Sequence, residues 1–105
     1  MDRKTVLIRE LEKFKKNVSR DIPIKRMIFF GSRATGTYKQ DSDIDLVVIS
    51  SKFREQKYRR RSLVLYNNWN LDYPVDFLCY TPEEFEKESK RITIVREAVK
   101  GGIVI

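Results

Sequence analysis

The sequence predicts an α+β fold in which a small mixed sheet is flanked by helices. Three short apolar runs, bounded by turn residues, have the length and composition of buried strands, and we place strands at residues 24–30, 43–49 and 75–80. The segments around them carry apolar residues at helical spacing instead. Because a helix with one apolar face must bury it against a sheet or another helix, this mixture of elements favours a layered α/β arrangement.

Residues 2–20 form the first helix that the sequence predicts. Their apolar side chains recur at the spacing of one helix face, at Leu7, Leu11, Phe14 and Val18. Asp2 is the expected N-cap, with Thr5 as the alternative, because such side-chain oxygens accept from the free amides of a first turn. Pro23 closes the segment, since the residue before a proline is disfavoured in the helical region.

Residues 54–69 form a second predicted helix. One face of it carries Tyr58, Ser62, Leu65 and Trp69, and the other faces carry most of the run Arg59, Arg60 and Arg61. A third helix begins at Pro82, with Thr81 as its cap.

The last predicted helix runs through Ile92, Val95 and Val99 to the pair Gly101-Gly102. The tail that follows, residues 103–105, is entirely apolar. We expect this tail either to add to the sheet or to bury itself against a partner.

The composition bounds the class of protein. A chain of 105 residues with 41% apolar side chains is expected to form one globular domain over residues 1–105. Its apolar runs are far shorter than the ~20 residues of a membrane-spanning helix. The first residues lead into a charged helical pattern rather than a signal peptide, so cytoplasmic residence is expected. A single cysteine, Cys79, excludes an internal disulfide and a cysteine zinc site.

Histidine is absent from the sequence. This absence excludes histidine general bases, histidine triads and histidine zinc sites, so acid–base chemistry must come from carboxylates, Tyr, Lys or a metal-bound hydroxyl. The net charge of +7 is compatible with anionic partners such as nucleotides, RNA or an acidic protein surface, and equally with an ordinary charged surface.

The most specific pattern in the chain is a Gly-Ser pair followed, after ten residues, by two aspartates. Gly31-Ser32 ends the second predicted element, and Asp43-Ile44-Asp45 opens the strand that follows. Gly31 allows a sharp turn and a close approach of the backbone to a phosphate. Ser32 adds a hydroxyl, and the amides of the next turn add donors toward an anion. An ordinary Gly-Ser turn is the alternative for the dipeptide alone.

The two aspartates are spaced to act together. In a strand, Asp43 and Asp45 point to the same face, with their Cβ atoms roughly 6–7 Å apart, and Ile44 points to the opposite face. Paired carboxylates are hard oxygen ligands that favour Mg²⁺ or Mn²⁺ over zinc. An isolated Asp-x-Asp is usually a pair of solvated acids, but the Gly-Ser pair at this spacing favours a phosphate and metal site.

Two other motifs that use these residues fail. Asp41, Asp43 and Asp45 imitate the start of a calcium-binding EF-hand loop, but Leu46 and Lys52 stand where Gly and Glu are needed. Gly31 and Gly36 open like a Walker A loop, but Thr37-Tyr38 replaces its Lys-Ser/Thr.

The stretch Gly31-Ser32-Arg33-Ala34-Thr35-Gly36, followed by Ser42-Asp43-Ile44-Asp45-Leu46, resembles the DNA polymerase beta-like nucleotidyltransferase superfamily and, within it, the minimal nucleotidyltransferases. The resemblance implies that superfamily's fold, a small mixed sheet backed by helices. It also implies a third carboxylate on a neighbouring strand. Asp76 fits, because an acid within the apolar run 75–80 is costly unless it is paired, exposed or metal-bound. Asp72 is the fallback.

The chemistry implied by the resemblance is the transfer of AMP from ATP. Asp43, Asp45 and Asp76 would hold Mg²⁺ or Mn²⁺ and act as the catalytic residues, while Gly31 and Ser32 would bind the β- and γ-phosphates. Arg33 either clamps a triphosphate oxygen or is a surface arginine paired with Asp41. An acceptor hydroxyl would displace pyrophosphate from the α-phosphorus, with Asp76 as its base.

The resemblance also implies a partner, since minimal nucleotidyltransferases commonly act as antitoxins beside a helical HEPN-domain toxin and transfer AMP to one of its tyrosines. A hetero-oligomer is therefore expected. One alternative is a binding module that neutralises its partner by contact alone, through the apolar tail 103–105 or through Tyr58, Tyr66 or Trp69. A third, less favoured possibility is RNA binding by the basic run 57–61.

Overall fold

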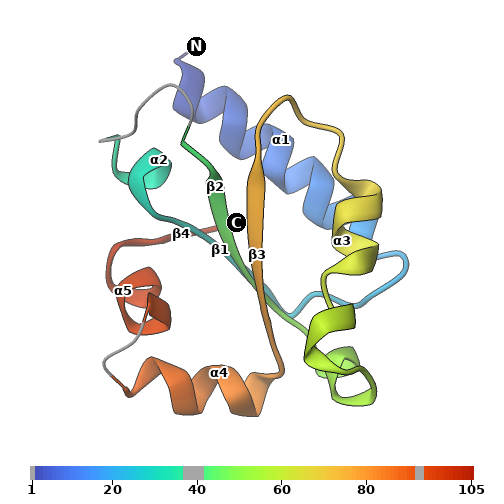
Figure 1. Ribbon diagram of the computed structural model, residues 1–105. Coiled ribbons are helices and arrows are strands. Elements are labelled where there is room, and N and C mark those ends of the chain that lie inside the picture. The colour runs from blue at the N-terminus through green and yellow to red at the C-terminus, as the bar shows by residue number, and fades with distance from the viewer. Residues whose placement is uncertain (1, 37–41, 92–93) are drawn as a thin grey trace.

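A four-stranded mixed sheet forms the centre of the protein, in the order β3-β2-β1-β4 (Figure 1). The structure is a computed structural model that describes residues 2–36, 42–91 and 94–105. The strands are β1 (Arg26–Phe30), β2 (Ile44–Ile49), β3 (Val75–Tyr80) and β4 (Ile103–Val104). β1 runs antiparallel to β2 and β4, whereas β2 and β3 are parallel. The predicted α+β class with a small mixed sheet is confirmed.

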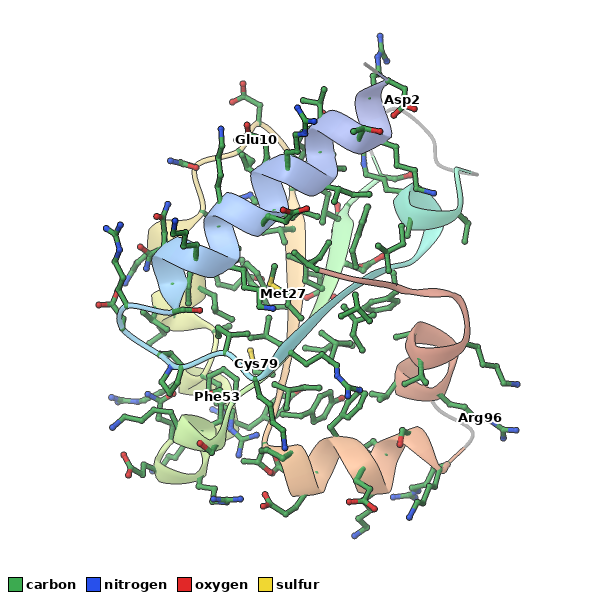
Figure 2. The ribbon with its side chains drawn as sticks, turned by 180° about the vertical axis from the view of Figure 1, so that it is seen from behind. Asp2, Glu10, Met27, Phe53, Cys79 and Arg96 are labelled. Atoms are coloured by element: carbon green, nitrogen blue, oxygen red, sulfur yellow. The ribbon has the colours of Figure 1, made fainter. Side chains whose placement is uncertain are left out.

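One face of the sheet is covered by α1 (Arg3–Val18), which lies across it in Figure 2. Asp2 caps this helix by accepting from the Thr5 amide at 2.7 Å, as the sequence predicts. All four predicted inward residues are buried, and they pack against strand residues that include Met27, Phe29, Leu46, Phe77 and Cys79. Burial at this helical spacing is what fixes α1 on the sheet.

The opposite face is covered by α4 (Pro82–Ser89) and α5 (Ile94–Gly101). Thr81 and Glu84 form a reciprocal capping box at the start of α4, which confirms Thr81 as the cap. α5 runs through Val95 and Val99, as the sequence predicts; Val95 and Ala98 are fully buried in it, whereas Val99 is 48% exposed. Ile92 lies outside the described residues.

The continuous helix predicted over residues 54–69 is also wrong. The segment instead forms two short 3-10 helices, η1 (Ser51–Glu55) and η2 (Tyr58–Arg60), followed by α3 (Leu63–Asn68). Gln56 and Lys57 are extended between them. This break lets the chain bury Phe53 and Leu65 together, and it turns Arg61 inward while leaving Tyr58 56% exposed.

Arg61 explains why the chain turns here. Its guanidinium bonds both carboxylate oxygens of Glu84, at 2.5 and 3.2 Å, and donates to the Cys79 carbonyl at 3.2 Å. It also lies over the rings of Phe53 and Tyr58. Helical periodicity cannot reveal that a charged residue is buried in this way, so the predicted exposure of Arg61 was wrong.

The apolar tail joins the sheet, which is one of the two outcomes expected for it. β4 pairs with Ile28 and Phe29 of β1, and the Ile105 amide donates to the Met27 carbonyl at 2.9 Å. The indole of Trp69 packs against Phe14 and Phe77, so this side chain belongs to the core. Among the helices that the structure describes, none has the length and apolar character needed to cross a lipid bilayer.

Candidate active site

The predicted acids come together where β2 and β3 begin. Asp43 immediately precedes β2, and Asp45 and Asp76 are the second residues of β2 and β3. The parallel register places Asp45 directly opposite Asp76. Neighbouring strands lie about 4.8 Å apart, so these two carboxylates share one small patch of the sheet. The prediction that Asp76 lies on a strand next to Asp45 is confirmed, whereas Asp72 lies in the bend before β3.

The acids share the sheet face that α4 and α5 cover elsewhere. Asp45 lies on the same face of β2 as Val47 and Ile49, which pack under these helices. Ile44 is fully buried on the other face. In Figure 1 the beginnings of β2 and β3 lie near α2 (Ser32–Thr35), at the end of the sheet away from α4. Asp43 and Asp76 are exposed and Asp45 is half-buried, so the face is accessible to a solute.

Asp45 carries the clearest electrostatic signature. Partial burial raises its pKa above the ordinary value of 3.8, and the negative charges of Asp76 and Asp43 raise it further. Its cross-strand neighbour on β1 is Phe30, an apolar side chain that contributes to this desolvation. A carboxylate that is partly desolvated and lies near two like charges is one that a bound cation would stabilise.

The Gly-Ser turn lies against this carboxylate. Gly31 caps α2 with φ of 85° and ψ of −168°, a conformation that L side chains rarely adopt. A Cβ atom at position 31 would overlap Asp45 Oδ2 and lie 3.2 Å from its Cγ. The sharp turn predicted at Gly31 is present, and its nearest neighbour is the metal-site candidate Asp45.

The short helix α2 arranges donors at the same corner. The Gly31 carbonyl accepts from the amides of Ala34 and Thr35, at 3.1 and 3.2 Å. The helical hydrogen bonds of α2 therefore begin at the Ala34 amide. The Thr35 hydroxyl donates to the Ser32 carbonyl at 3.1 Å. Ser32, half-buried at the start of α2, is placed beside Gly31 and thus near Asp45.

Arg33 has contacts that sequence reasoning did not anticipate. Its Nε donates to the Ser42 carbonyl at 2.6 Å, and its guanidinium lies 4.8 Å from the centre of the Tyr73 ring. Ser42 precedes Asp43, and Tyr73 lies three residues before Asp76. Arg33 thus ties the Gly-Ser turn to both strand ends that carry the acids. Asp41, its predicted alternative partner, lies outside the described residues.

Tyr66 lies at the end of β3 that carries Asp76, but on the α1-covered face of the sheet, opposite the acids, and the sequence did not assign it to the site. Its hydroxyl donates to the Val75 carbonyl at 3.3 Å, next to Asp76 in the chain, and its ring packs edge-on against Phe77. Partial burial, followed by the negative charges of Asp76 and Asp43, raises its pKa above 10.0. No sequence pattern marks this residue, because its place depends on how α3 packs beside β3.

The carboxylates of Asp43, Asp45 and Asp76 offer only oxygen ligands, which suit Mg²⁺ or Mn²⁺. The negative charges of Asp43 and Asp76 near Asp45 also favour a bound cation. Within residues 2–36, 42–91 and 94–105, however, no group of three Asp, Glu, Cys or His side chains converges as metal ligands do. The three carboxylates repel one another, and a bound cation would offset that repulsion. The residues therefore fit a divalent cation in chemistry and in backbone position.

Comparison with known proteins settles the family. A profile of the nucleotidyltransferase domain matches residues 11–100, which is most of the chain and includes the whole candidate site. The chain belongs to the nucleotidyltransferase domain family. The resemblance seen in the Gly-Ser and Asp-x-Asp stretch is thereby confirmed, and the protein is a member of a family of transferases.

Two relatives extend this assignment. A Methanocaldococcus jannaschii protein named as a putative protein adenylyltransferase is 28% identical over 71 residues, which cover 66% of this chain and 72% of that protein. The crystal structure of a putative nucleotidyltransferase from Sulfolobus solfataricus superimposes with a TM-score of 0.68. That alignment covers 96% of this chain and 80% of the other at 20% identity, so it shows a shared fold.

Proposed function

We propose that this nucleotidyltransferase transfers AMP from ATP to a tyrosine hydroxyl of a partner protein, with release of pyrophosphate. The observation that carries the proposal is the direct pairing of Asp45 with Asp76 beside the Gly31 turn. Its support from comparison is the resemblance to a protein named as an adenylyltransferase. The partner we propose is a helical HEPN-domain toxin, for which this protein would act as the antitoxin, as the sequence resemblance implies.

The proposed role of each residue follows from its position in the site. Asp43, Asp45 and Asp76 would hold Mg²⁺ or Mn²⁺, and the bound ion supplies positive charge that neutralises the phosphates and the developing charge on the leaving group. Gly31 and Ser32 bind the β- and γ-phosphates through backbone and hydroxyl donors. Arg33 keeps the turn and the two strand ends in register, through Ser42 and Tyr73.

Proton transfer falls to a carboxylate, because the sequence contains no histidine. Asp76 is exposed on the edge strand β3, so an incoming hydroxyl can reach it. It accepts the hydroxyl proton while the hydroxyl oxygen attacks the α-phosphorus. The bond from that phosphorus to the bridging oxygen breaks, and pyrophosphate leaves.

The structure weakens the RNA-binding alternative. That alternative needs the basic run 57–61 as one exposed surface, but Arg61 is only 7% exposed and is bonded to Glu84. Lys57, Arg59 and Arg60 remain exposed, but Lys57 precedes the short 3-10 helix η2 and the two arginines lie within it, so the run does not follow one face of a long helix. Neutralisation by contact alone remains the second candidate, favoured by the exposed apolar side chains of Tyr58 and Leu63.

The test is transfer of α-labelled ATP, with Mg²⁺, to proteins of the source cell or to a helical protein encoded next to this one. We expect label on one small protein, lost with Asp43→Asn and kept with Asp72→Asn, a matched change in the bend before β3. Tight binding of the helical neighbour without transfer of label from any nucleotide would refute transferase activity and favour neutralisation by contact.

A further inference from the structure

An open hollow outside the candidate active site lies where η2 meets α3. It has a volume of about 610 Å³, and its lining includes two cations, Lys57 and Arg60, and two aliphatic side chains, Leu63 and Val64. The elements that form it lie beside the edge strand β3, on the side of the protein away from α2 (Figure 1). Most of the lining side chains are exposed, so the hollow offers a surface to a protein segment rather than an enclosed pocket.

Lys57 and Arg60 lie on the same side of one 3-10 turn. The Arg60 amide donates to the Lys57 carbonyl at 2.9 Å, which closes this turn. Because side chains at i and i+3 of a 3-10 helix eclipse and the rise is about 2.0 Å per residue, the two cations are about 6 Å apart along the axis. Residues at i and i+4 of an α-helix have a similar separation, about 5–6 Å between Cβ atoms. Two carboxylates with that spacing can therefore meet both cations at once.

Both cations are available to a partner. Among the residues that the structure describes, neither Lys57 nor Arg60 forms an ion pair, and both are exposed. Glu55, which also lines the hollow, pairs instead with Lys52 at 3.4 Å. Two unpaired like charges this close repel one another, and carboxylates from a partner would offset that repulsion.

The aliphatic part of the hollow favours a protein partner over a nucleic acid. Leu63 is 55% exposed, and its neighbour Val64 is half-buried and packs against the core under α1. An aliphatic side chain placed on Leu63 would remove apolar surface from water on both partners. Nucleic-acid bases bind instead by stacking on aromatic rings. Tyr58, the aromatic residue of η2, packs towards Tyr80 and does not line the hollow.

The neighbouring edge of the sheet does not favour an added strand. The β3 carbonyls of Val75 and Cys79 already accept from the side chains of Tyr66 and Arg61. A strand that paired with β3 would have to displace both contacts, one of which holds a buried guanidinium. A helix, whose backbone bonds are internal, can dock through its side chains alone.

We propose that this hollow, the α3 hollow, docks an acidic amphipathic helix of a protein partner. Two carboxylates at i and i+4 of that helix meet Lys57 and Arg60, and an aliphatic side chain on the same face covers Leu63. The inference concerns a surface outside the candidate active site, so it does not depend on AMP transfer.

The probe is a synthetic helical peptide with glutamates at i and i+4 and a leucine at i+7, added to the full chain while its backbone amide resonances are followed. We expect saturable shifts centred on residues 57–64. Lys57→Glu combined with Arg60→Glu should weaken binding by about tenfold or more, because two attractive pairs become repulsive. Leu63→Gln should weaken it several-fold.

The matched control is Lys16→Glu combined with Arg20→Glu, which changes the net charge equally at exposed positions near the end of α1. Because salt screens exposed charges that are distant from the peptide, this control should change the affinity by less than about twofold. Resonances of the sheet that stay in place show that each variant keeps its fold.

Several results would overturn the inference. Equal binding of a peptide with lysines in place of both glutamates, or unchanged affinity of Lys57→Glu with Arg60→Glu, would each do so. Shifts centred on another element such as α4, or no saturable shift with millimolar peptide, would also contradict it. A single-stranded oligouridylate that displaces the peptide and binds Leu63→Gln as tightly as the native protein would assign the α3 hollow to nucleic acid instead.

Discussion

The α-carbon of Gly31 lies directly against the carboxylate of Asp45. A Cβ atom at position 31 would overlap Asp45 Oδ2 and lie 3.2 Å from Cγ, and the backbone there has φ of 85°. Position 31 therefore requires glycine for two reasons: the positive φ of the turn, and the lack of space for a Cβ atom beside the Asp45 carboxylate. The Gly-Ser turn and the strand that carries Asp45 are packed together as one unit.

Gly31→Ala should therefore abolish transfer and lower the free energy of unfolding by about 1–3 kcal/mol, from backbone strain and displacement of Asp45. The matched control is Gly36→Ala. Gly36 has the same φ of 85°, but a Cβ atom there would meet nothing within 4 Å. This control should cost only the strain, about 1 kcal/mol, and keep its activity. Equal activity of the two variants in the labelling assay would refute a special role for the Gly31–Asp45 contact.

Asp45→Asn should stabilise the metal-free protein at neutral pH while abolishing transfer. Burial and the charges of Asp76 and Asp43 raise the pKa of Asp45, so the folded state binds its proton more strongly than the unfolded state does. Stability therefore falls as pH rises from 3.8 through the folded-state pKa, and above it the full penalty is present. The substitution removes this penalty.

Thermal melts of both proteins without metal check this expectation. The Tm of Asp45→Asn should exceed that of the native protein at neutral pH, and the difference should vanish below pH 3.8. Asp72→Asn, an exposed change in the bend before β3, should leave Tm unchanged. A lower Tm for Asp45→Asn at neutral pH would show that the carboxylate is stabilising as it stands.

The contact between Arg33 and Tyr73 offers a way to separate positioning from nucleotide binding. If Arg33 acts through the Tyr73 ring, Tyr73→Leu should slow transfer and Tyr73→Phe should not, because only the ring faces the guanidinium. A double-mutant cycle with Arg33→Gln should give a coupling of about 0.5–1 kcal/mol in unfolding experiments. Full activity of Tyr73→Leu beside an inactive Arg33→Gln would favour the triphosphate clamp instead.

Arg61 should contribute more to stability than its neighbours in the basic run. Arg61→Ala removes a buried guanidinium from Glu84 and the Cys79 carbonyl, and we expect a loss of about 2 kcal/mol or more. This value is below that of a fully buried pair because the Glu84 side chain is 44% exposed. Arg59→Ala, at an exposed position, should change the free energy of unfolding by less than about 0.5 kcal/mol.

The pH dependence of the Arg61 effect has a defined sign. The hydrogen bond from Arg61 is the main cause that lowers the pKa of Glu84 below 4.5. The stabilisation is therefore present above pH 4.5 and is lost as pH falls through the folded-state pKa. Urea unfolding of Arg61→Ala and the native protein should converge in acid. A difference that stays constant with pH would assign the effect of Arg61 to packing on Phe53 and Tyr58 alone.

Elements with one strongly apolar face were predictable from the sequence. The four inward residues of α1 follow helical periodicity, and the strand ending at Phe30 is a continuous apolar run that is buried on both faces of the sheet. The Asp-x-Asp pair and Asp76 were also identified, since acids in apolar strands are costly without a reason. Each of these inferences uses residues that are close in the sequence.

The errors came from interactions between distant segments. Arg61 is neutralised by Glu84 and a β3 carbonyl, which breaks the helix expected over residues 54–69. Arg33 of α2 contacts Tyr73 in the bend before β3, and Tyr66 is placed by the packing of α3 beside β3. Periodicity alone does not resolve such choices.

We infer that the Gly-Ser turn and the acids of β2 and β3 form one metal–nucleotide site. The most direct measurement is a titration of the protein with Mn²⁺ and ATP, followed by paramagnetic broadening of backbone amide resonances. We expect residues 31–32, 43–45 and 75–77 to broaden first, with the effect lost in Asp45→Asn and kept in Asp72→Asn. Broadening centred elsewhere, such as on the acidic helix α4, or unchanged by Asp45→Asn, would contradict the account.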